Sequence, residues 1–254
     1  SVVNALSSSI EIWIKRDSKQ YYMQFESGAK SKDLEEIGEV GKRNTGTLIK
    51  FSPDPQYFDT VKFSIKNLRH NLRSKAVLCP GLEVNFVNEI DETTDKWLFE
   101  DGIKDYLQAS LDGLECIPAI PFVISSKTKE EQLDCALTWT ENTTNTTAES
   151  FVNLIPTIGG GTHVNGLRSG LTDALKEFCE FRSLIPKNIK LTPDDVWQNI
   201  AFVLSIKILD PQFSGQTKER LSSRECASFV SGVVKDSFSL WLNQHTDIAE
   251  KIAE

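Results

Sequence analysis

Three short segments combine glycine with hydroxyl or cationic side chains, which are residue types that hold phosphates and nucleotides. The first is RNTGTLIKF at 43–51, where Gly46 lies between Thr45 and Thr47. Gly46 permits a close backbone approach, and the hydroxyl of Thr47 can hold a ligand group or a water at the start of a strand. A plain turn is the alternative, and the spacing alone favours it.

The second segment is PTIGGGTHVNG at 156–166, with three glycines directly before an expected helix. Free amides at a helix N-terminus behind such a loop can bind an anion. The segment lacks both the P-loop pattern and the GxGxxG pattern of a dinucleotide fold. A structural turn capped by Thr162 is therefore favoured. We expect His163 to be a hydrogen-bonded structural histidine rather than a ligand or a general base.

The third segment is DPQFSGQTKERLSS at 210–223, an expected loop between a strand and the last helix. The ammonium group of Lys218 is a compact charge with three donors and can reach a phosphate, while Gln216 can donate a second hydrogen bond. A solvated surface lysine is the alternative, and the spacing does not decide between the two.

Other catalytic and metal-binding patterns are absent from the sequence. There is no GxSxG, no HExxH and no cluster of carboxylates, and the three histidines are far apart. The polar stretch NTTNTT at 142–147 indicates a surface loop. The five cysteines form no CxxC pair, which favours reduced and mostly buried thiols at Cys79, Cys116, Cys135, Cys179 and Cys226.

Composition bounds the class of protein. With 254 residues and 39% hydrophobic content, the chain is long enough for one large domain or two ordinary ones. The net charge of −8 argues against a surface whose main task is to neutralise DNA phosphates, so any DNA role is indirect or local. No stretch approaches the roughly 20 apolar residues of a membrane span, and no secretion signal is evident. We expect a cytoplasmic protein with no membrane partner.

Hydrophobic patterning predicts the elements that must position these segments. In the first part, alternation over 10–14 and 21–26 indicates a β-hairpin, and 46–54 a third strand that Pro53 stops. A helix follows and ends at Pro80, before a strand at 82–89. The helix has a stripe of Ile65, Leu68, Leu72 and Ala76.

The polar stretch DETTDK gives way to a new helical start, and we place a domain boundary near residue 99. Strands are expected at 134–140, 149–157 and 201–210. Helices are expected where Thr192 and Pro193 open a short one and where SSRE from Ser222 fits a capping box. The long helix between them has a predicted buried stripe of Leu167, Leu171, Ala174, Phe178 and Phe181.

Five segments, in this order along the chain, resemble the B subunits of bacterial type II DNA topoisomerases. They are SVVNALS (1–7), RNTGTLIKFSPD (43–54), KAVLCPGLEVNF (75–86), FVNLIPTIGGGTHVNGLRSGL (151–171) and DPQFSGQTKERLSS (210–223). The agreement runs from residue 1 to about 250. Within the family, the words LCPG, NLIPT, HVNGLR and QTKERLSS are more similar to topoisomerase IV than to gyrase, which is the runner-up.

The resemblance implies an α+β fold in two parts. Residues 1–98 would form the C-terminal part of a GHKL (Bergerat) ATP-binding domain, and 99–254 a transducer domain of the ribosomal protein S5 domain 2-like α/β fold. The family's glycine-rich lid, general-base Glu, Mg²⁺-binding Asn and adenine-reading Asp precede SVVNALS. The chain has no initiator Met and none of these parts, so we expect a fragment that does not hydrolyse ATP alone.

The resemblance also implies roles for four residues. Thr47 would help to hold the adenine and its water, Arg16 would flank the adenine pocket, and Gln216 with Lys218 would reach the γ-phosphate. No catalytic residue and no metal ligand is expected in this chain.

The cofactors implied for the full-length enzyme are ATP and Mg²⁺. The implied partners are the A subunit of topoisomerase IV in a heterotetramer, a second B subunit joined through ATP-dependent dimerisation, and duplex DNA. The implied function couples ATP binding and hydrolysis to strand passage, decatenation and relaxation.

Two readings of other classes remain open. In one, the chain is a DNA-contacting clamp module without its own catalysis. This module would line a cavity with five basic residues, for which a solvated face is the favoured alternative: Lys62, Lys66, Arg69, Arg73 and Lys75.

In the other reading, the chain is a different GHKL member, such as a mismatch-repair or chaperone ATPase. The QTK and GGTH motifs disfavour this reading.

Overall fold

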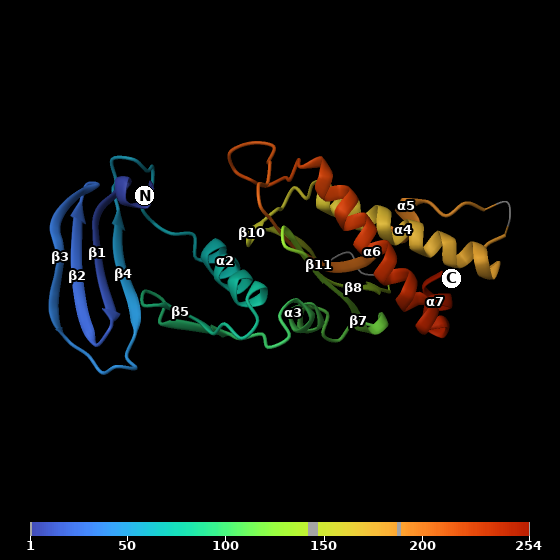
Figure 1. Ribbon diagram of the computed structural model, residues 1–254, viewed down its shortest axis with the longest axis horizontal. Coiled ribbons are helices and arrows are strands. Elements are labelled where there is room, and N and C mark those ends of the chain that lie inside the picture. Colours follow the sequence, from blue (N-terminus) through green and yellow to red (C-terminus); the bar gives the residue numbers. More distant parts are fainter. Residues whose placement is uncertain (1, 142–146, 187–188, 254) are drawn as a thin grey trace. The chain divides into compact units, whose positions relative to one another are not determined.

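The computed structural model describes residues 2–141, 147–186 and 189–253. Helix and sheet are mixed throughout, which confirms the expected α+β class. The chain divides into two compact units, Ser1–Ile65 and Lys66–Glu254, and each is described by itself (Figure 1). Apart from Thr147, the predicted polar loop at 142–147 lies outside the described residues.

The first unit is a short helix and a four-stranded antiparallel sheet in the order β3-β2-β1-β4. The predicted hairpin is confirmed, because Ile12 of β1 lies opposite Met23 of β2. The predicted third strand is also confirmed, with Ile49 opposite Ile12 on its other side. The elements are α1 (Val2–Ala5), β1 (Ser7–Arg16), β2 (Lys19–Glu26), β3 (Ala29–Glu39) and β4 (Gly46–Pro53).

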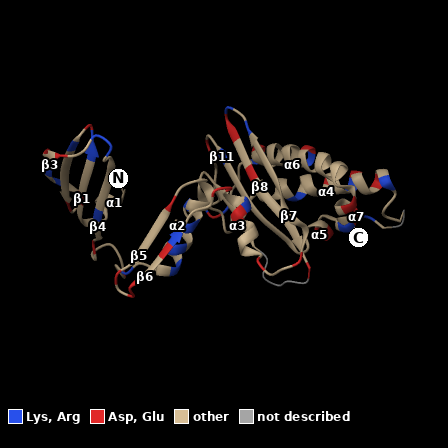
Figure 2. Ribbon diagram, turned by 90° about the horizontal axis from the view of Figure 1, so that it is seen from below, with Lys and Arg blue, Asp and Glu red and all other residues tan. Residues whose placement is uncertain are grey.

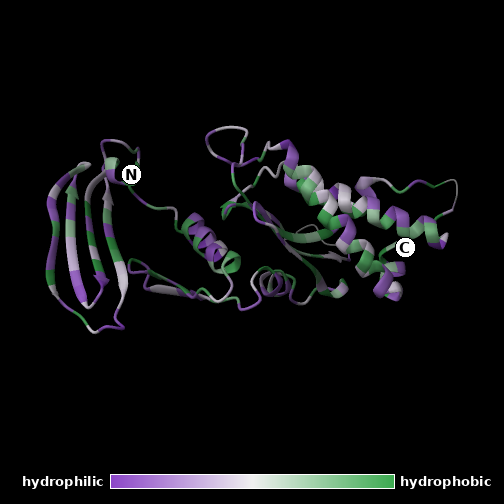
Figure 3. Ribbon diagram, viewed as in Figure 1, coloured by the Kyte–Doolittle hydropathy of each residue, from purple (hydrophilic) through white to green (hydrophobic). Residues whose placement is uncertain are grey.

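Strand β3 was not predicted from the sequence. It is an edge strand, and all of its residues are exposed. A strand that buries neither face needs no alternation of apolar and polar residues, so the period-two signal is weak there. The alternation along β1 and β2 is visible in Figure 3.

The second unit is built on a five-stranded sheet in the order β10-β9-β11-β8-β7. Central strand β11 runs parallel to β9 and antiparallel to β8. Both of its faces are buried, and Phe202 and Val203 point to opposite sides. The strands are β7 (Cys116–Lys127), β8 (Glu131–Thr140), β9 (Ala148–Val152), β10 (Ile155–Pro156) and β11 (Ile200–Ile208).

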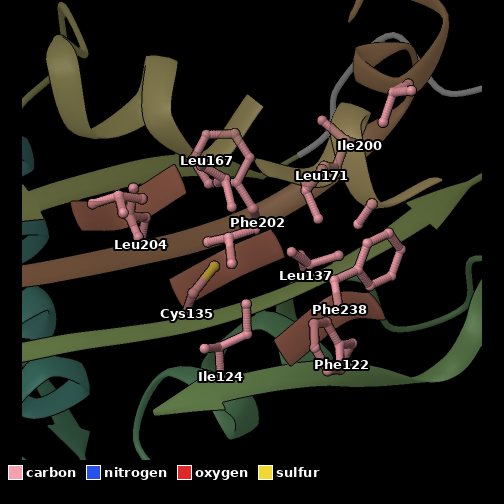
Figure 4. Close-up of a cluster of buried hydrophobic side chains, with 14 of the residues drawn as sticks. Phe122, Ile124, Cys135, Leu137, Leu167, Leu171, Ile200, Phe202, Leu204 and Phe238 are labelled. Atoms are coloured by element: carbon pink, nitrogen blue, oxygen red, sulfur yellow. The ribbon is translucent and has the colours of Figure 1, made fainter. Parts of the chain in front are cut away.

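Helices cover both faces of this sheet. On one face lie α4 (Thr162–Arg182), α5 (Pro193–Trp197), α6 (Arg224–Gln244) and α7 (Thr246–Ala253). Figure 4 shows side chains from that face and its helices filling one core. On the other face, α2 (Ile65–Leu78) and α3 (Ile103–Ser110) form a second cluster with the sheet. Strands β5 (Val84–Asn88) and β6 (Thr93–Trp97) form a separate hairpin.

Helices α4 and α6 cross closely because two glycines of α4 face the backbone of α6. A Cβ at Gly166 would lie 2.5 Å from the carbonyl oxygen of Ala227, and one at Gly170 would lie 2.6 Å from that of Ser231. Any side chain at either position would therefore push the helices apart.

Two details of the predicted helices are corrected. The stripe of α4 ends at buried Phe178, because Phe181 is 87% exposed in the last turn. The capping box at Ser222 does not form: α6 begins after Ser223, whose hydroxyl accepts a hydrogen bond from the Gln212 amide instead. By contrast, the short helix α5 does begin with a capping box at Thr192.

The first compact unit ends at Ile65, well before the domain boundary expected near residue 99. The reason is the packing of α2: Val77 and Leu78 are buried together with Leu107 of α3 under the second face of the sheet. The boundary between residues 98 and 99 concerns the domains of the family and stays a prediction. All five cysteines are free, as expected.

Candidate functional site

The structure brings Arg16 and Thr47 together at one end of the four-stranded sheet. Arg16 ends β1 and Thr47 lies near the start of β4, where the register pairs Ile14 with Thr47. Both residues line the same open hollow, together with Lys15 and Lys42. The hollow therefore offers a hydroxyl and several cations to a polar or anionic ligand.

Neither of these two side chains is enclosed by other residues. Arg16 is 79% exposed, and its Nε lies 3.5 Å from the carboxylate of the neighbouring Asp17. Thr47 is also exposed. A weak contact between exposed neighbours leaves the guanidinium available to a ligand.

Gln216 and Lys218 lie in the second unit, in the segment between β11 and α6. We call residues 215–218 the tip of this segment, and residues 219–222, which lead back towards α6, its returning limb. Backbone bonds close the neck of this segment: the Ser214 amide donates to the Arg220 carbonyl at 2.9 Å, and the Ser222 amide donates to the Gln212 carbonyl at 2.8 Å. Both predicted residues are exposed beyond that neck. The tip therefore presents them on a short, closed loop.

Lys218 has a left-handed backbone, with φ of 58°, and its amide donates to the Gly215 carbonyl at 3.4 Å. Its ammonium lies 6.0 Å from the centre of the Phe213 ring. Among the residues that the structure describes, no carboxylate forms an ion pair with it. The charge of Lys218 can therefore meet an external anion.

The three glycines before α4 form the surface on which the returning limb of the tip docks. The Gly159 amide donates to the Glu219 carbonyl at 2.9 Å, and the Leu221 amide donates to the Gly160 carbonyl at 3.0 Å. The amide of Thr162 then donates to the Leu221 carbonyl at 3.1 Å. The turn at 159–161 is therefore structural, as favoured from the sequence.

The predicted cap of that turn is wrong. The N-cap of α4 is Gly161, and the buried hydroxyl of Thr162 has no hydrogen-bond partner within the described ranges. Gly161 takes this place because the limb at Leu221 approaches so closely that a side chain would overlap it. Sequence reasoning also missed Arg220, whose guanidinium donates to the Gly159 carbonyl at 3.0 Å. The run of glycines was a signal of close backbone approach, but it did not name the partner segment.

His163 is a fully buried structural histidine, as predicted. Its Nε2 lies 3.0 Å from the Thr157 hydroxyl, which in turn lies 2.7 Å from the hydroxyl of Ser150 on β9. Burial lowers the pKa of His163 to about 4, so the imidazole is neutral near pH 7. This chain of hydroxyls and imidazole ties the turn before α4 to the sheet.

The four predicted ligand-binding residues thus form two pairs, one in each unit. Of the five predicted clamp residues, Arg69, Arg73 and Lys75 lie on α2 and make contacts within the second unit. Arg69 pairs with Asp95 of β6 at 2.6 Å, and the charges of both elements are marked in Figure 2. Arg73 lies 4.7 Å from the Tyr106 ring, and Lys75 donates to the Leu154 carbonyl. These contacts occupy three of the five side chains, whereas Lys62 and Lys66 are exposed.

Within residues 2–141, 147–186 and 189–253, no group of three or more His, Cys, Asp or Glu side chains is arranged to hold a metal ion. No helix in these ranges is both long and apolar enough to cross a membrane.

Comparison with known proteins agrees with the predicted family. Residues 102–254 match the family model described as DNA gyrase B. The whole chain aligns with the B subunit of DNA topoisomerase 4 from Haemophilus influenzae at 55% identity and spans 40% of that relative's length.

Two solved structures are also similar. The topoisomerase IV ATP-binding domain of Francisella tularensis, in complex with a small-molecule inhibitor, gives a TM-score of 0.82 at 46% identity, over 99% of this chain and 68% of that one. The 43K ATPase domain of Thermus thermophilus gyrase B, in complex with an aminocoumarin, gives 0.83 at 28% identity, with the same coverage of both chains.

Proposed function

The chain belongs to the DNA gyrase B family, and on that premise we propose that it is part of the ATPase and transducer region of a topoisomerase IV B subunit. The observation that carries the proposal is the placement of Lys218. Within the described residues this cation forms no ion pair, and it lies on a tip whose limb is docked backbone to backbone. Such a tip is suited to report on an anion bound elsewhere in the enzyme.

We propose the division into two domains that the family implies. Residues 1–98 are the C-terminal part of a GHKL ATP-binding domain, and 99–254 are the S5 domain 2-like transducer. Two observations support this division: the family model begins at residue 102, and α3 begins at Ile103.

The chain's own residues have separate tasks when ATP is bound. Thr47 donates or accepts a hydrogen bond at the adenine and its water, and Arg16 covers the flank of that pocket. Gln216 and Lys218 bind the γ-phosphate, where an ammonium stabilises the charge that develops during phosphoryl transfer. ATP supplies the phosphoryl group, and Mg²⁺ in the full-length protein supplies further charge neutralisation.

This arrangement couples nucleotide state to the position of the transducer. If the lysine of one domain forms its ion pair only with a phosphate that is bound to the other domain, the relative orientation of the two domains depends on whether ATP is bound. In the full-length protein, ATP also draws two B subunits together, while the A subunits of topoisomerase IV and duplex DNA complete the assembly. The function is then ATP-dependent strand passage, with decatenation and relaxation, in the cytoplasm.

Two alternatives are weaker. A gyrase origin is less well supported, because identity is 55% to the topoisomerase 4 relative and 28% to the gyrase structure. A DNA-contacting clamp module built on α2 is disfavoured, because Arg69, Arg73 and Lys75 make contacts within the unit.

The test uses the full-length protein reconstituted with its A-type partner. We expect ATP-dependent decatenation of linked DNA circles and relaxation of supercoils. Introduction of negative supercoils into relaxed DNA would assign the chain to gyrase instead. Decatenation that proceeds equally without ATP would contradict the proposal altogether.

A further inference from the structure

The tip that carries Lys218 is short, exposed and conformationally unusual. Gly215 and Lys218 both have positive φ, at 108° and 58°. Among the described backbone bonds, only the weak one from the Lys218 amide to Gly215 closes the tip from within, while its neck is closed at Ser214 and Arg220. A segment with so few internal bonds samples several conformations unless it is held from outside.

Gly159 holds the returning limb through both of its backbone groups. Its amide donates to the Glu219 carbonyl at 2.9 Å, and its carbonyl accepts from the Arg220 guanidinium at 3.0 Å. The docked residues directly follow Lys218 in the chain. Within the described part of the chain, Arg220 has the only side chain of residues 214–222 that donates a hydrogen bond to the glycine turn at 159–161.

The glycine turn is itself a rigid support. Its first part is anchored to β9, since the Thr157 amide donates to the Ser150 carbonyl at 2.8 Å and the Thr157 hydroxyl contacts buried His163. Strain or movement at Gly159 is therefore resisted by a buried network.

We propose that Arg220 is a positioning residue for the phosphate-binding tip: its bond to the Gly159 carbonyl fixes the direction in which Lys218 projects. This inference rests on the proposed role of Lys218. The Arg220 side chain is exposed, and its bond is to a neutral carbonyl, so it adds order to the tip rather than stability to the fold. Its effect on turnover passes entirely through Lys218.

The experiment measures ATP turnover of the full-length protein reconstituted with its A-type partner. Arg220→Ala should lower kcat roughly fivefold to tenfold while KM for ATP changes by less than about twofold. The reason is that Lys218 would be less well ordered and would stabilise the charge of the transition state less. Arg220→Lys, which keeps a cationic donor group on a long side chain, should lower kcat less than Arg220→Ala does. Arg224→Ala removes a nearby exposed arginine with no described contact and serves as the matched control.

The decisive comparison is a double-mutant cycle. In a Lys218→Ala background, Arg220→Ala should lower kcat by no more than about twofold further, because the residue through which it acts is gone. Independent, multiplicative losses would show that Arg220 contacts the nucleotide or acts elsewhere, and would overturn the inference. Normal turnover of Arg220→Ala would overturn it too.

Failure of this inference is distinguishable from failure of the proposed function. If Lys218→Ala is severely impaired and Arg220→Ala is normal, only the positioning role is wrong. If Lys218→Ala itself turns over normally, the assignment of the tip to phosphate binding is wrong. Thermal unfolding of each variant confirms that the fold is retained, and Arg220→Lys provides the measurement if Arg220→Ala does not fold.

Discussion

Gly161 and Leu221 lie backbone against backbone, as a parallel bridge between the start of α4 and the limb that returns from the Lys218 tip. A side chain at Gly161 would overlap both the amide and the carbonyl of Leu221, and the φ of 135° disfavours any other residue. This contact between a segment near residue 160 and one near residue 220 is made by backbone atoms alone.

Gly161→Ala should therefore destabilise the second unit by about 2 kcal/mol or more, through overlap and a disfavoured φ together. Urea unfolding followed by tryptophan fluorescence measures the free energy of unfolding. Gly232→Ala is the matched control: Gly232 is exposed within α6 with open space around it, so the same substitution should be neutral or stabilise by up to ~1 kcal/mol. Equal effects of the two substitutions would contradict the close approach.

Lys218→Ala in the full-length protein should cut ATP turnover by roughly 10²-fold or more, as loss of an electrostatic contact to the transition state usually does. ADP affinity, measured by calorimetry, should change little because ADP lacks the γ-phosphate. Lys129→Ala, an exposed turn lysine of the same unit, is the control. Turnover within about twofold of the parent, or ~0.4 kcal/mol, is too small for a lost phosphate contact.

Protonation of His163 should make the second unit sensitive to acid. The folded pKa of about 4 lies below the ordinary value of 6.5, so the unfolded chain binds the proton more readily. The stability from the neutral imidazole is present above pH 6.5 and is lost as pH falls towards 4, by about 3 kcal/mol in total.

His163→Gln removes this titration while it keeps an amide that can reach Thr157. The difference in unfolding free energy between parent and variant should therefore depend on pH between 6.5 and 4. His70→Gln, at an exposed position of α2, is the control for loss of an imidazole outside the buried network. A pH-independent difference for His163→Gln would rule out the buried neutral imidazole as the cause.

A polypeptide limited to residues 1–254 should show no ATPase activity and negligible affinity for ATP, because the proposed contacts of Arg16, Thr47 and Lys218 are all exposed and therefore weak. Calorimetry with a non-hydrolysable ATP analogue measures this directly. Binding at micromolar concentration would show that the two described pairs, Arg16 with Thr47 and Gln216 with Lys218, are sufficient for recognition.

Residues 99–254 should fold without 1–98, but with lower stability than residues 66–254. The shorter piece lacks α2, so Val77 and Leu78 no longer cover the second face of the sheet. Loss of two buried aliphatic side chains costs about 3 kcal/mol or more. Thermal unfolding of both pieces tests this, and absence of a cooperative transition in 99–254 would show that the boundary near residue 99 does not delimit an independent unit.

The sequence by itself determined several of the elements whose periodicity follows burial, although β7, which buries Phe122 and Ile124, was not predicted. The stripe from Leu167 to Phe178 and the strand around Phe202 were predictable because one face, or both, is packed against a core. The motif words around Thr47 and Lys218 likewise pointed to a nucleotide through family resemblance. Strand β3 escaped prediction because it buries no side chain.

Only the tertiary structure decided what the glycine run is for. In the sequence, free amides before a helix are equally compatible with anion binding and with docking of another backbone segment. Which of the two occurs depends on which distant segment packs against the amides in the folded chain. The same holds for Arg220 and for the cations of α2: the partner of Arg220 is Gly159, 61 residues away along the chain, and that of Arg69 is Asp95, 26 residues away. Local patterns carry the period of a helix or a strand, whereas the partner of a polar group is fixed only when the chain folds back on itself.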